Sequence, residues 1–320
     1  MSEIVGLVLP FFGIIFAGFV AARITRQPID ALGWMNTFIL YVALPALFFQ
    51  LLSKTPFEQL TEWRYIAGAV IASYSMFVIM FVGSMLVQRS GIAESTMRAF
   101  GACYGNIGYM GPGIALLALG EEAAVPVALI FCVENALHFC VAPTMMALAG
   151  DDRRPPLQLA AEVVRKILLH PFIVASLFGV AAAYFQFRAP LPIERLLDYF
   201  ARAAAPCALF AMGVTLALRP LKRVPREIGP ILLLKLILQP LLCYVVLSWI
   251  GNFSPIWMFS AIVLAALPTA TNVFVIAQQY NVWVERASAT ILISTCVSVV
   301  TLSGLLYMIM HGMLIPDLFP

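Results

Sequence analysis

Length, composition and charge exclude most classes of soluble protein. The chain has 320 residues, of which 62% are hydrophobic and 11% are charged. A typical soluble domain contains about 45–50% apolar residues, so a soluble enzyme, a nucleic-acid-binding protein and a disordered chain all fit poorly. The formal net charge of +3 is too small to indicate a polyanionic partner. The composition predicts a polytopic helical membrane protein, with room for roughly ten spans of about 20 residues.

Hydropathy predicts ten transmembrane helices joined by short loops that carry most of the charge. We expect these spans at residues 4–22, 31–52, 65–87, 98–120, 124–147, 167–187, 193–218, 228–250, 255–280 and 287–311. The first apolar run has no basic region before it, which argues against a cleavable signal peptide. The longest connection, 148–166, ends in an amphipathic stretch. That stretch is expected either to lie along the membrane interface or to lead simply into the sixth span.

The placement of lysine and arginine predicts the orientation. Thirteen of the 19 basic residues fall in one alternating set of loops, beginning with Arg23 and Arg26. Four fall in the opposite set, namely Lys54, Arg64, Arg188 and Arg195. Because cytoplasmic loops carry the excess of positive charge, we expect both termini to lie outside.

An internal repeat divides the chain into halves. Pro10, Phe11 and Gly18 recur as Pro171, Phe172 and Gly179, and PALFF at Pro45 recurs as PCALF at Pro206, all at an offset of 161 residues. A repeat of five spans places the two copies in opposite orientations, which is a transporter architecture. We therefore expect a first repeat at 1–147, a cytoplasmic connection at 148–166 and an inverted repeat at 167–320. Chance coincidence of prolines and glycines is the alternative.

Two of the expected spans are interrupted in corresponding regions. The fourth contains GNIGYMGPG and the ninth contains LPTATN. Proline and glycine weaken a helix, and freed backbone groups must line protein or a wet cavity. Each broken helix would present a half-helix N-terminus with partial positive charge, suited to an anion. Ordinary proline kinks with small residues for packing are the alternative. The substrate-binding candidates are Asn106, Gly108, Tyr109, Pro112, Pro268, Thr269, Thr271 and Asn272.

Three ionisable side chains lie inside expected spans. Glu134 and His138 are one helical turn apart in the fifth span, and Lys235 lies in the eighth. Buried ionisable groups in a membrane are functional hypotheses by default. Glu134 would carry a proton or coordinate a cation, with His138 as its relay, and Lys235 would attract an anionic substrate. The alternative is that Glu134 pairs with Lys235 or His138 only to hold helices together.

Motifs for catalysis and metal binding are missing. The sequence contains no His-Glu-x-x-His, Gly-x-Ser-x-Gly, P-loop or dinucleotide fingerprint. Its six cysteines lie in apolar runs without ligand spacing, and its three histidines fall in different spans. We expect neither an enzyme, a metal site nor a cofactor.

The motifs together are similar to the auxin efflux carrier family, which includes plant auxin exporters and bacterial carboxylate carriers such as malonate permeases. The resemblance covers nearly the whole chain, and rests on MNTFILYVALPALFFQLLSK, GNIGYMGPGIA and ALPTATNVFVIAQQY. It implies two inverted five-helix repeats with two crossing broken helices, a scaffold domain, a mobile transport domain with elevator-type movement, and a tendency to form homodimers. Asn106, Pro112, Pro268 and Asn272 would border the substrate. The short central connection is closer to the bacterial carriers.

The leading hypothesis is a secondary transporter of a small organic anion in a bacterial inner membrane. The substrate would be a mono- or dicarboxylate such as malonate, or an auxin-like weak acid. A membrane ligand sensor using the same pocket is the alternative from another class. A sodium-coupled symporter of the related bile acid type is the nearest alternative transporter, but the ninth span contains no acidic residue between Pro255 and Tyr280. The lipid bilayer is the expected surrounding, and no nucleic acid is expected as a partner.

Overall fold

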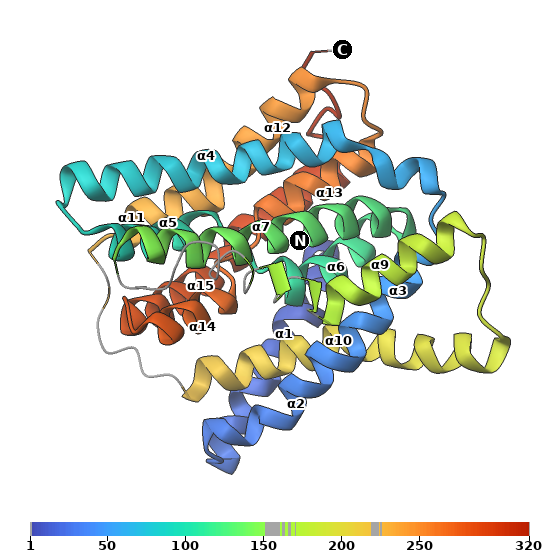
Figure 1. The fold of residues 1–320 in the computed structure, drawn as a ribbon, viewed down its shortest axis with the longest axis horizontal. Coiled ribbons are helices and arrows are strands. Elements are labelled where there is room, and N and C mark those ends of the chain that lie inside the picture. The colour runs from blue at the N-terminus through green and yellow to red at the C-terminus, as the bar shows by residue number, and fades with distance from the viewer. Residues whose placement is uncertain are drawn as a thin grey trace. The chain divides into compact units, whose positions relative to one another are not determined.

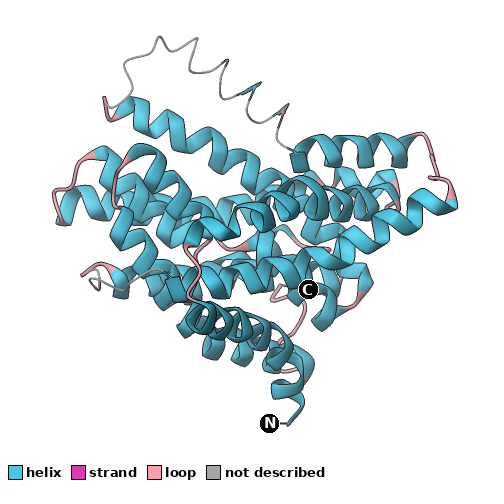
Figure 2. Ribbon diagram, turned by 90° about the horizontal axis from the view of Figure 1, so that it is seen from below, coloured by secondary structure: helices cyan, strands magenta, loops and turns pink. Residues whose placement is uncertain are grey.

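All regular elements among the described residues are helices (Figures 1 and 2). A computed structural model describes residues 2–150, 171–218 and 226–319, with a few isolated positions between them. The α-helices in chain order are α1 (Ser2–Thr25), α2 (Gly33–Phe38), α3 (Leu44–Ser53), α4 (Trp63–Val87), α5 (Ile92–Cys103), α6 (Ile107–Leu119), α7 (Ala124–Leu148), α9 (Pro171–Tyr184), α10 (Leu191–Leu218), α11 (Ile228–Leu233), α12 (Gln239–Ile250), α13 (Pro255–Ala265), α14 (Thr271–Tyr280) and α15 (Val284–Met310).

Two π-helical turns make continuous rods from helices that would otherwise be separate. One turn, Ile39–Ala43, joins α2 to α3, and the other, Leu234–Leu238, joins α11 to α12. Each is followed closely by a proline near the start of the next helix, Pro45 or Pro240. Proline lacks an N–H and cannot complete the regular ladder, so a wider turn is a local way to continue the helix.

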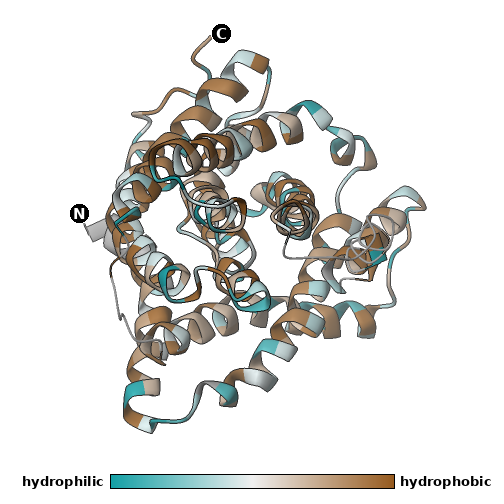
Figure 3. Cartoon of the chain, turned by 60° about the vertical axis from the view of Figure 1, so that its left-hand side comes forward, coloured by the Kyte–Doolittle hydropathy of each residue, from teal (hydrophilic) through white to brown (hydrophobic). Residues whose placement is uncertain are grey.

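Six helical segments among the described residues are long and apolar enough to cross a membrane: Asp30–Ser53, Trp63–Val87, Glu121–Leu148, Leu191–Leu218, Ile228–Ile250 and Val284–Met310. Shorter apolar helices stand where the first, fourth, sixth and ninth spans are expected. The fourth and ninth are short because each is split in two, into α5 with α6 and α13 with α14. Most helical turns are brown or pale in Figure 3. The architecture is that of a polytopic membrane protein; the count of ten spans stays a prediction.

The chain folds into two compact units. Unit 1 contains residues 1–63, 108–132 and 166–220, and unit 2 contains residues 64–107, 133–165 and 221–320. Each unit contains segments from both expected repeats. The two compact units therefore do not coincide with the two expected repeats. The connecting residues of both helix interruptions, 104–106 and 266–270, lie in unit 2, together with α5, α13 and α14, whereas α6 belongs to unit 1 from Gly108 onward.

Two close helix contacts in unit 1 involve residues that correspond to each other at the offset of 161 residues. A Cβ on Gly18 of α1 would lie 2.2 Å from the carbonyl oxygen of Phe210 in α10. Its counterpart 161 residues later is Gly179 of α9. A Cβ on Gly179 would lie 3.2 Å from the carbonyl oxygen of Phe49 in α3. Phe49 and Phe210 are also 161 residues apart. Small residues let helix backbones approach closely in membranes, so equivalent glycines seat the first helix of each half against the second helix of the other.

Replacing Gly18 by alanine should destabilise unit 1, because the added methyl group would overlap the backbone of α10 rather than a movable side chain. We expect a loss of about 1–3 kcal/mol in the free energy of unfolding, as in overpacked cores. Gly13 is the matched control on the same helix, since a Cβ there meets nothing within 4 Å. Thermal unfolding in detergent measures both variants; equal midpoints would contradict the close contact.

Candidate functional site

Two non-helical segments interrupt apolar helices in unit 2. The first is Tyr104–Asn106, between α5 and α6, and the second is Ala266–Ala270, between α13 and α14. The first break lies at the start of the expected segment GNIGYMGPG and includes its first two residues, Gly105 and Asn106. Pro112 lies inside α6, so the proline of this segment does not form the interruption. The break occurs instead where the backbone finds hydrogen-bond partners in the other break.

The two breaks are joined by backbone hydrogen bonds. The N–H of Asn106 donates to the carbonyl of Pro268 at 2.8 Å, and the N–H of Ala270 donates to the carbonyl of Tyr104 at 2.9 Å. Gly105 and Thr269 form an antiparallel bridge between them. Exposed backbone groups are costly in a bilayer, and this pairing satisfies them within the protein. The structure thus brings Asn106, Pro268 and Thr269 together, and the sequence analysis had grouped these three residues in one candidate site.

A tyrosine that the sequence analysis missed links the second break to α7. Asn272, in the first turn of α14, donates its amide to the hydroxyl of Tyr104 at 2.8 Å. That hydroxyl donates to Oδ1 of Asn135 at 2.6 Å. The ring of Tyr104 stacks on His138 with centroids 3.9 Å apart. Tyr104 directly follows α5 and Asn135 lies inside α7, and both are buried, so a polar group in an apolar segment is the signal that could have found them, as it found Glu134.

Glu134 and His138 lie on one face of α7, as their spacing predicted, and both are buried. Nδ1 of His138 lies 2.5 Å from the backbone oxygen of Glu134. Since a carbonyl can only accept, Nδ1 carries the proton of that bond. The carboxylate of Glu134 accepts instead from the hydroxyl of Ser73 at 2.6 Å, and that hydroxyl accepts from the amide of Gln239 at 2.9 Å. Among the described residues Glu134 forms no direct salt bridge, although its charge and that of Lys235 interact at longer range.

The other candidate residues have more local surroundings. The hydroxyl of Thr269 donates to the carbonyl of Gly101 at 2.8 Å, and Thr271 is the half-buried first residue of α14. Gly108, Tyr109 and Pro112 belong to unit 1. A Cβ on Gly108 would lie 2.8 Å from the ring of Phe131. Glycine therefore permits the close packing of α6 on α7 within that unit.

The start of α14 is suited to a negatively charged ligand. Its N-cap residue, Ala270, offers no side chain to the first turn, so backbone N–H groups there lack the usual capping partner. The helix dipole adds partial positive charge at the same end. The polar groups beside it are an amide from Asn272 and the Tyr104–Asn135 pair. The described residues contain no group of three or more His, Cys, Asp or Glu side chains that could hold a metal.

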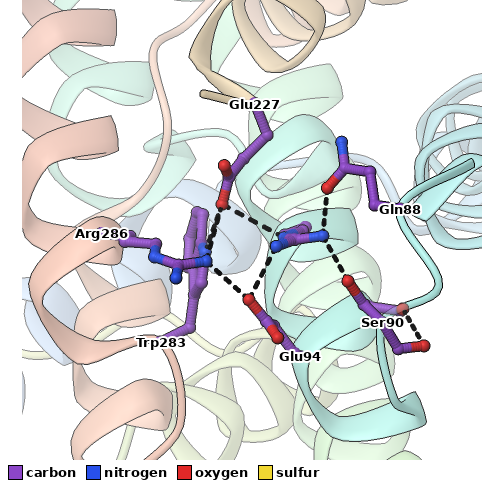
Figure 4. Close-up of polar contacts among 8 residues, drawn as sticks. Gln88, Ser90, Glu94, Glu227, Trp283 and Arg286 are labelled. Atoms are coloured by element: carbon purple, nitrogen blue, oxygen red, sulfur yellow. Dashed lines mark hydrogen bonds and ion pairs between the residues drawn. The ribbon is translucent and has the colours of Figure 1, made fainter. Parts of the chain in front are cut away.

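A second buried polar cluster lies elsewhere in unit 2 (Figure 4). Arg98 was expected at a loop boundary, but α5 begins earlier and buries its side chain. It contacts the carboxylates of Glu94 at 2.7 Å and Glu227 at 3.1 Å. Arg286 contacts the same two carboxylates, and Nε1 of Trp283 donates to Glu227 at 2.8 Å. A boundary drawn from hydropathy cannot foresee that a buried arginine is neutralised by partners distant in sequence.

Glu227 precedes α11 and has a shifted pKa. Burial alone raises the pKa of this carboxyl, but the hydrogen bond from Trp283 and the charges of Arg98 and Arg286 outweigh it. The pKa of Glu227 therefore lies below its ordinary value of 4.5. The cluster is a neutral, internally paired set of charges, which is a structural clamp among α5, α11 and α15 rather than a ligand site.

Long apolar helices, two of them interrupted and joined through buried polar groups, define a membrane transporter. Comparison with known proteins agrees, since the chain belongs to the membrane transport protein family, whose profile matches residues 3–306. This confirms the family resemblance and the expectation of an integral membrane transporter rather than an enzyme.

Three relatives show how widely this sequence pattern occurs. The chain is 60% identical over the whole of both sequences to a Rhizobium meliloti protein named "Putative malonate transporter". It is 24% identical to "Uncharacterized transporter YfdV" of Escherichia coli, over 94% of this chain and 96% of that one. It is 25% identical to the mouse "Lysosomal cholesterol signaling protein", over 91% of this chain but only 36% of that protein.

Proposed function

We propose that this protein transports a small organic anion, with malonate as the first candidate substrate. The observation that carries the proposal is the joined pair of breaks beside the uncapped start of α14, with Tyr104, Asn135 and Asn272 around it. The name of the Rhizobium meliloti relative supports the choice of malonate. Mono- or dicarboxylates and auxin-like weak acids remain the wider substrate class.

The proposed anion site uses neutral donors. A carboxylate would accept hydrogen bonds from the first-turn N–H groups of α14 and from the amides of Asn272 and Asn106, where partial positive charge favours it. A site made of dipoles and amides holds an anion without a permanent ion pair, which suits a substrate that must be released on the other side. Thr271 and Pro268 would border the same space within unit 2.

We further propose an elevator-type movement in which unit 2 is the mobile body. The connecting residues of both breaks and the start of α14 lie in unit 2, so a site built on them would move with it. The reciprocal packing of Gly18 on Phe210 and Gly179 on Phe49 supports two inverted repeats. In this proposal the transporter lies in a bacterial inner membrane with both termini outside, and the scaffold of unit 1 is where a homodimer would form.

Glu134 is the proposed proton carrier. It is buried and its carboxylate receives the hydroxyl of Ser73. The groups packed about it are His138 on its own helix, Cys103 from α5, and Lys235 and Gln239 from the α11–α12 rod. His138 would hold the local backbone and stack on Tyr104, which connects the proposed proton site to the proposed substrate site.

Uptake of labelled malonate into proteoliposomes tests the function. We expect uptake by the wild-type protein that rises when the outside is made more acidic, and excess unlabelled malonate should compete. In Glu134→Gln, net uptake should lose its dependence on the pH gradient while malonate still raises the melting temperature of the purified protein. Uptake equal to that of protein-free vesicles would contradict transport, and an unchanged pH response in Glu134→Gln would contradict its role.

A membrane ligand sensor is the second candidate, because one relative is named as a signaling protein. The same preparation separates the two functions. A carboxylate that raises the melting temperature without crossing the vesicle membrane would favour a sensor. Malonate movement that saturates with concentration would favour the transporter.

A further inference from the structure

Two helix C-termini meet at the breaks and present backbone carbonyl groups inside unit 2. Helix α5 ends at Cys103 and α13 ends at Ala265. The last carbonyls of a helix lack partners within it and carry partial negative charge. In transporters built on broken helices, such ends coordinate the coupling cation. A donor or a cation is therefore required at this place in the fold.

The donors come from two consecutive turns of the α11–α12 rod. Nζ of Lys235 donates to the carbonyl of Ala265 at 2.7 Å. Nε2 of Gln239, four residues later, donates to the carbonyl of Cys103 at 3.2 Å. Both side chains are buried, and Lys235 is 0% exposed. One rod thus supplies the end of α13 with an ammonium group and the end of α5 with an amide.

The ammonium group of Lys235 also lies against the first break. A Cβ on Gly105 would stand 3.2 Å from this Nζ and 3.3 Å from the carbonyl oxygen of Leu264. Glycine at position 105 leaves the space that the cation fills. Among the described residues Lys235 forms no salt bridge; its ammonium group donates to a backbone carbonyl, and the charge of Glu134 acts on it from a longer distance.

The local backbone helps to place this side chain. Lys235 lies in the π-helical turn Leu234–Leu238, which Pro240 follows. Such turns are rare, and they occur frequently at functional sites. Burying an ammonium group in a membrane protein is costly. Its burial at a helix break therefore indicates a functional role for this charge.

We propose that Lys235 is a built-in monovalent cation that occupies the place where a coupling sodium ion would bind, so that transport needs no sodium. The proposal rests on the proposed transport function, and it adds that the transport cycle does not use sodium. Lys235 acts as a specificity-determining residue: it holds the end of α13 at the break in every state, and a free cation has no vacant set of carbonyls to enter. It is not assigned to the substrate anion.

The test compares two variants. Lys235→Ala empties the space that the lysine side chain occupies beside the carbonyl of Ala265, and Lys235→Met fills most of that space without a charge. We expect sodium chloride, relative to choline chloride at equal ionic strength, to raise the melting temperature of Lys235→Ala by about 2–4 °C, because the ion binds only the folded state. The wild-type protein and Lys235→Met should not respond. Lys54→Ala removes an exposed lysine of unit 1 and is the matched control.

Malonate uptake provides the second measurement. Wild-type uptake should be equal in sodium and choline, whereas Lys235→Ala should lose at least tenfold in choline and recover part of that loss in sodium. Lys235→Arg keeps the charge and should stay independent of sodium. A wild-type protein that sodium stabilises or activates would overturn the proposal, as would a folded Lys235→Ala that is indifferent to sodium in both measurements. The melting experiment needs no substrate, so it stands even if malonate is not transported.

Discussion

Asn272→Ala should weaken malonate binding by tenfold or more while the protein remains folded. Its amide reaches the hydroxyl of Tyr104 at 2.8 Å, and its position in the first turn of α14 places it at the proposed carboxylate. Losing a hydrogen bond to a charged group costs about 1.5–3 kcal/mol, and each 1.4 kcal/mol is a factor of about ten in affinity. Titration of the purified variant with malonate, followed by thermal shift or calorimetry, measures the change.

Two companions make the result specific. Tyr104→Phe keeps the ring that stacks on His138 but removes the hydroxyl that receives Asn272 and donates to Asn135. A smaller loss of affinity in this variant would show that Asn272 acts directly on the ligand as well as through Tyr104. Asn252→Gly changes an exposed loop amide in the same unit, at a position with φ of 66°, and should bind normally. Wild-type affinity in Asn272→Ala would remove α14 from the site.

Arg98→Ala should have the largest effect on stability, about 3 kcal/mol or more in the free energy of unfolding. The substitution leaves the buried carboxylate of Glu227 with only the longer contact to Arg286 at 3.4 Å and the donor of Trp283. Removing one partner of a buried ion pair typically costs 3–5 kcal/mol. Arg202→Ala is the control, since its i,i+4 pair with Asp198 is exposed and should contribute less than about 1 kcal/mol.

The pH dependence of stability gives the same cluster a second signature. Because the pKa of Glu227 is lowered by folding, its ionised form contributes stability above the ordinary value of 4.5. That contribution is lost as the pH falls through the lower pKa of the folded state. Melting curves of the wild-type protein should show this loss on acidification, and Glu227→Gln should lack it. Equal stability of Arg98→Ala and Arg202→Ala would show that the cluster is not a clamp.

The sequence was most informative where a local pattern has one physical meaning. Uninterrupted apolar runs predicted the helices, because the period and length of such runs reflect the bilayer directly. Pro10, Gly18 and Pro45 predicted a repeat, which stays a prediction; Gly18 and Gly179, which stand at its offset, both lie close to the backbone of a neighbouring helix. The polar residues of LPTATN marked the second break because Pro268 cannot continue a helix.

The tertiary structure decided which residues meet. Pro112 looked like the cause of the first break, yet it lies inside α6, and the break forms where Asn106 and Tyr104 find backbone partners near Pro268. Lys235 was expected to pair with Glu134 or to attract a substrate anion; its hydrogen bond goes to the carbonyl of Ala265, and Glu134 acts on it only through its charge. Composition and periodicity determine whether a segment is a helix in a membrane. Hydrogen-bond partners far apart in the chain decide how its polar groups are satisfied, and only the folded backbone specifies them.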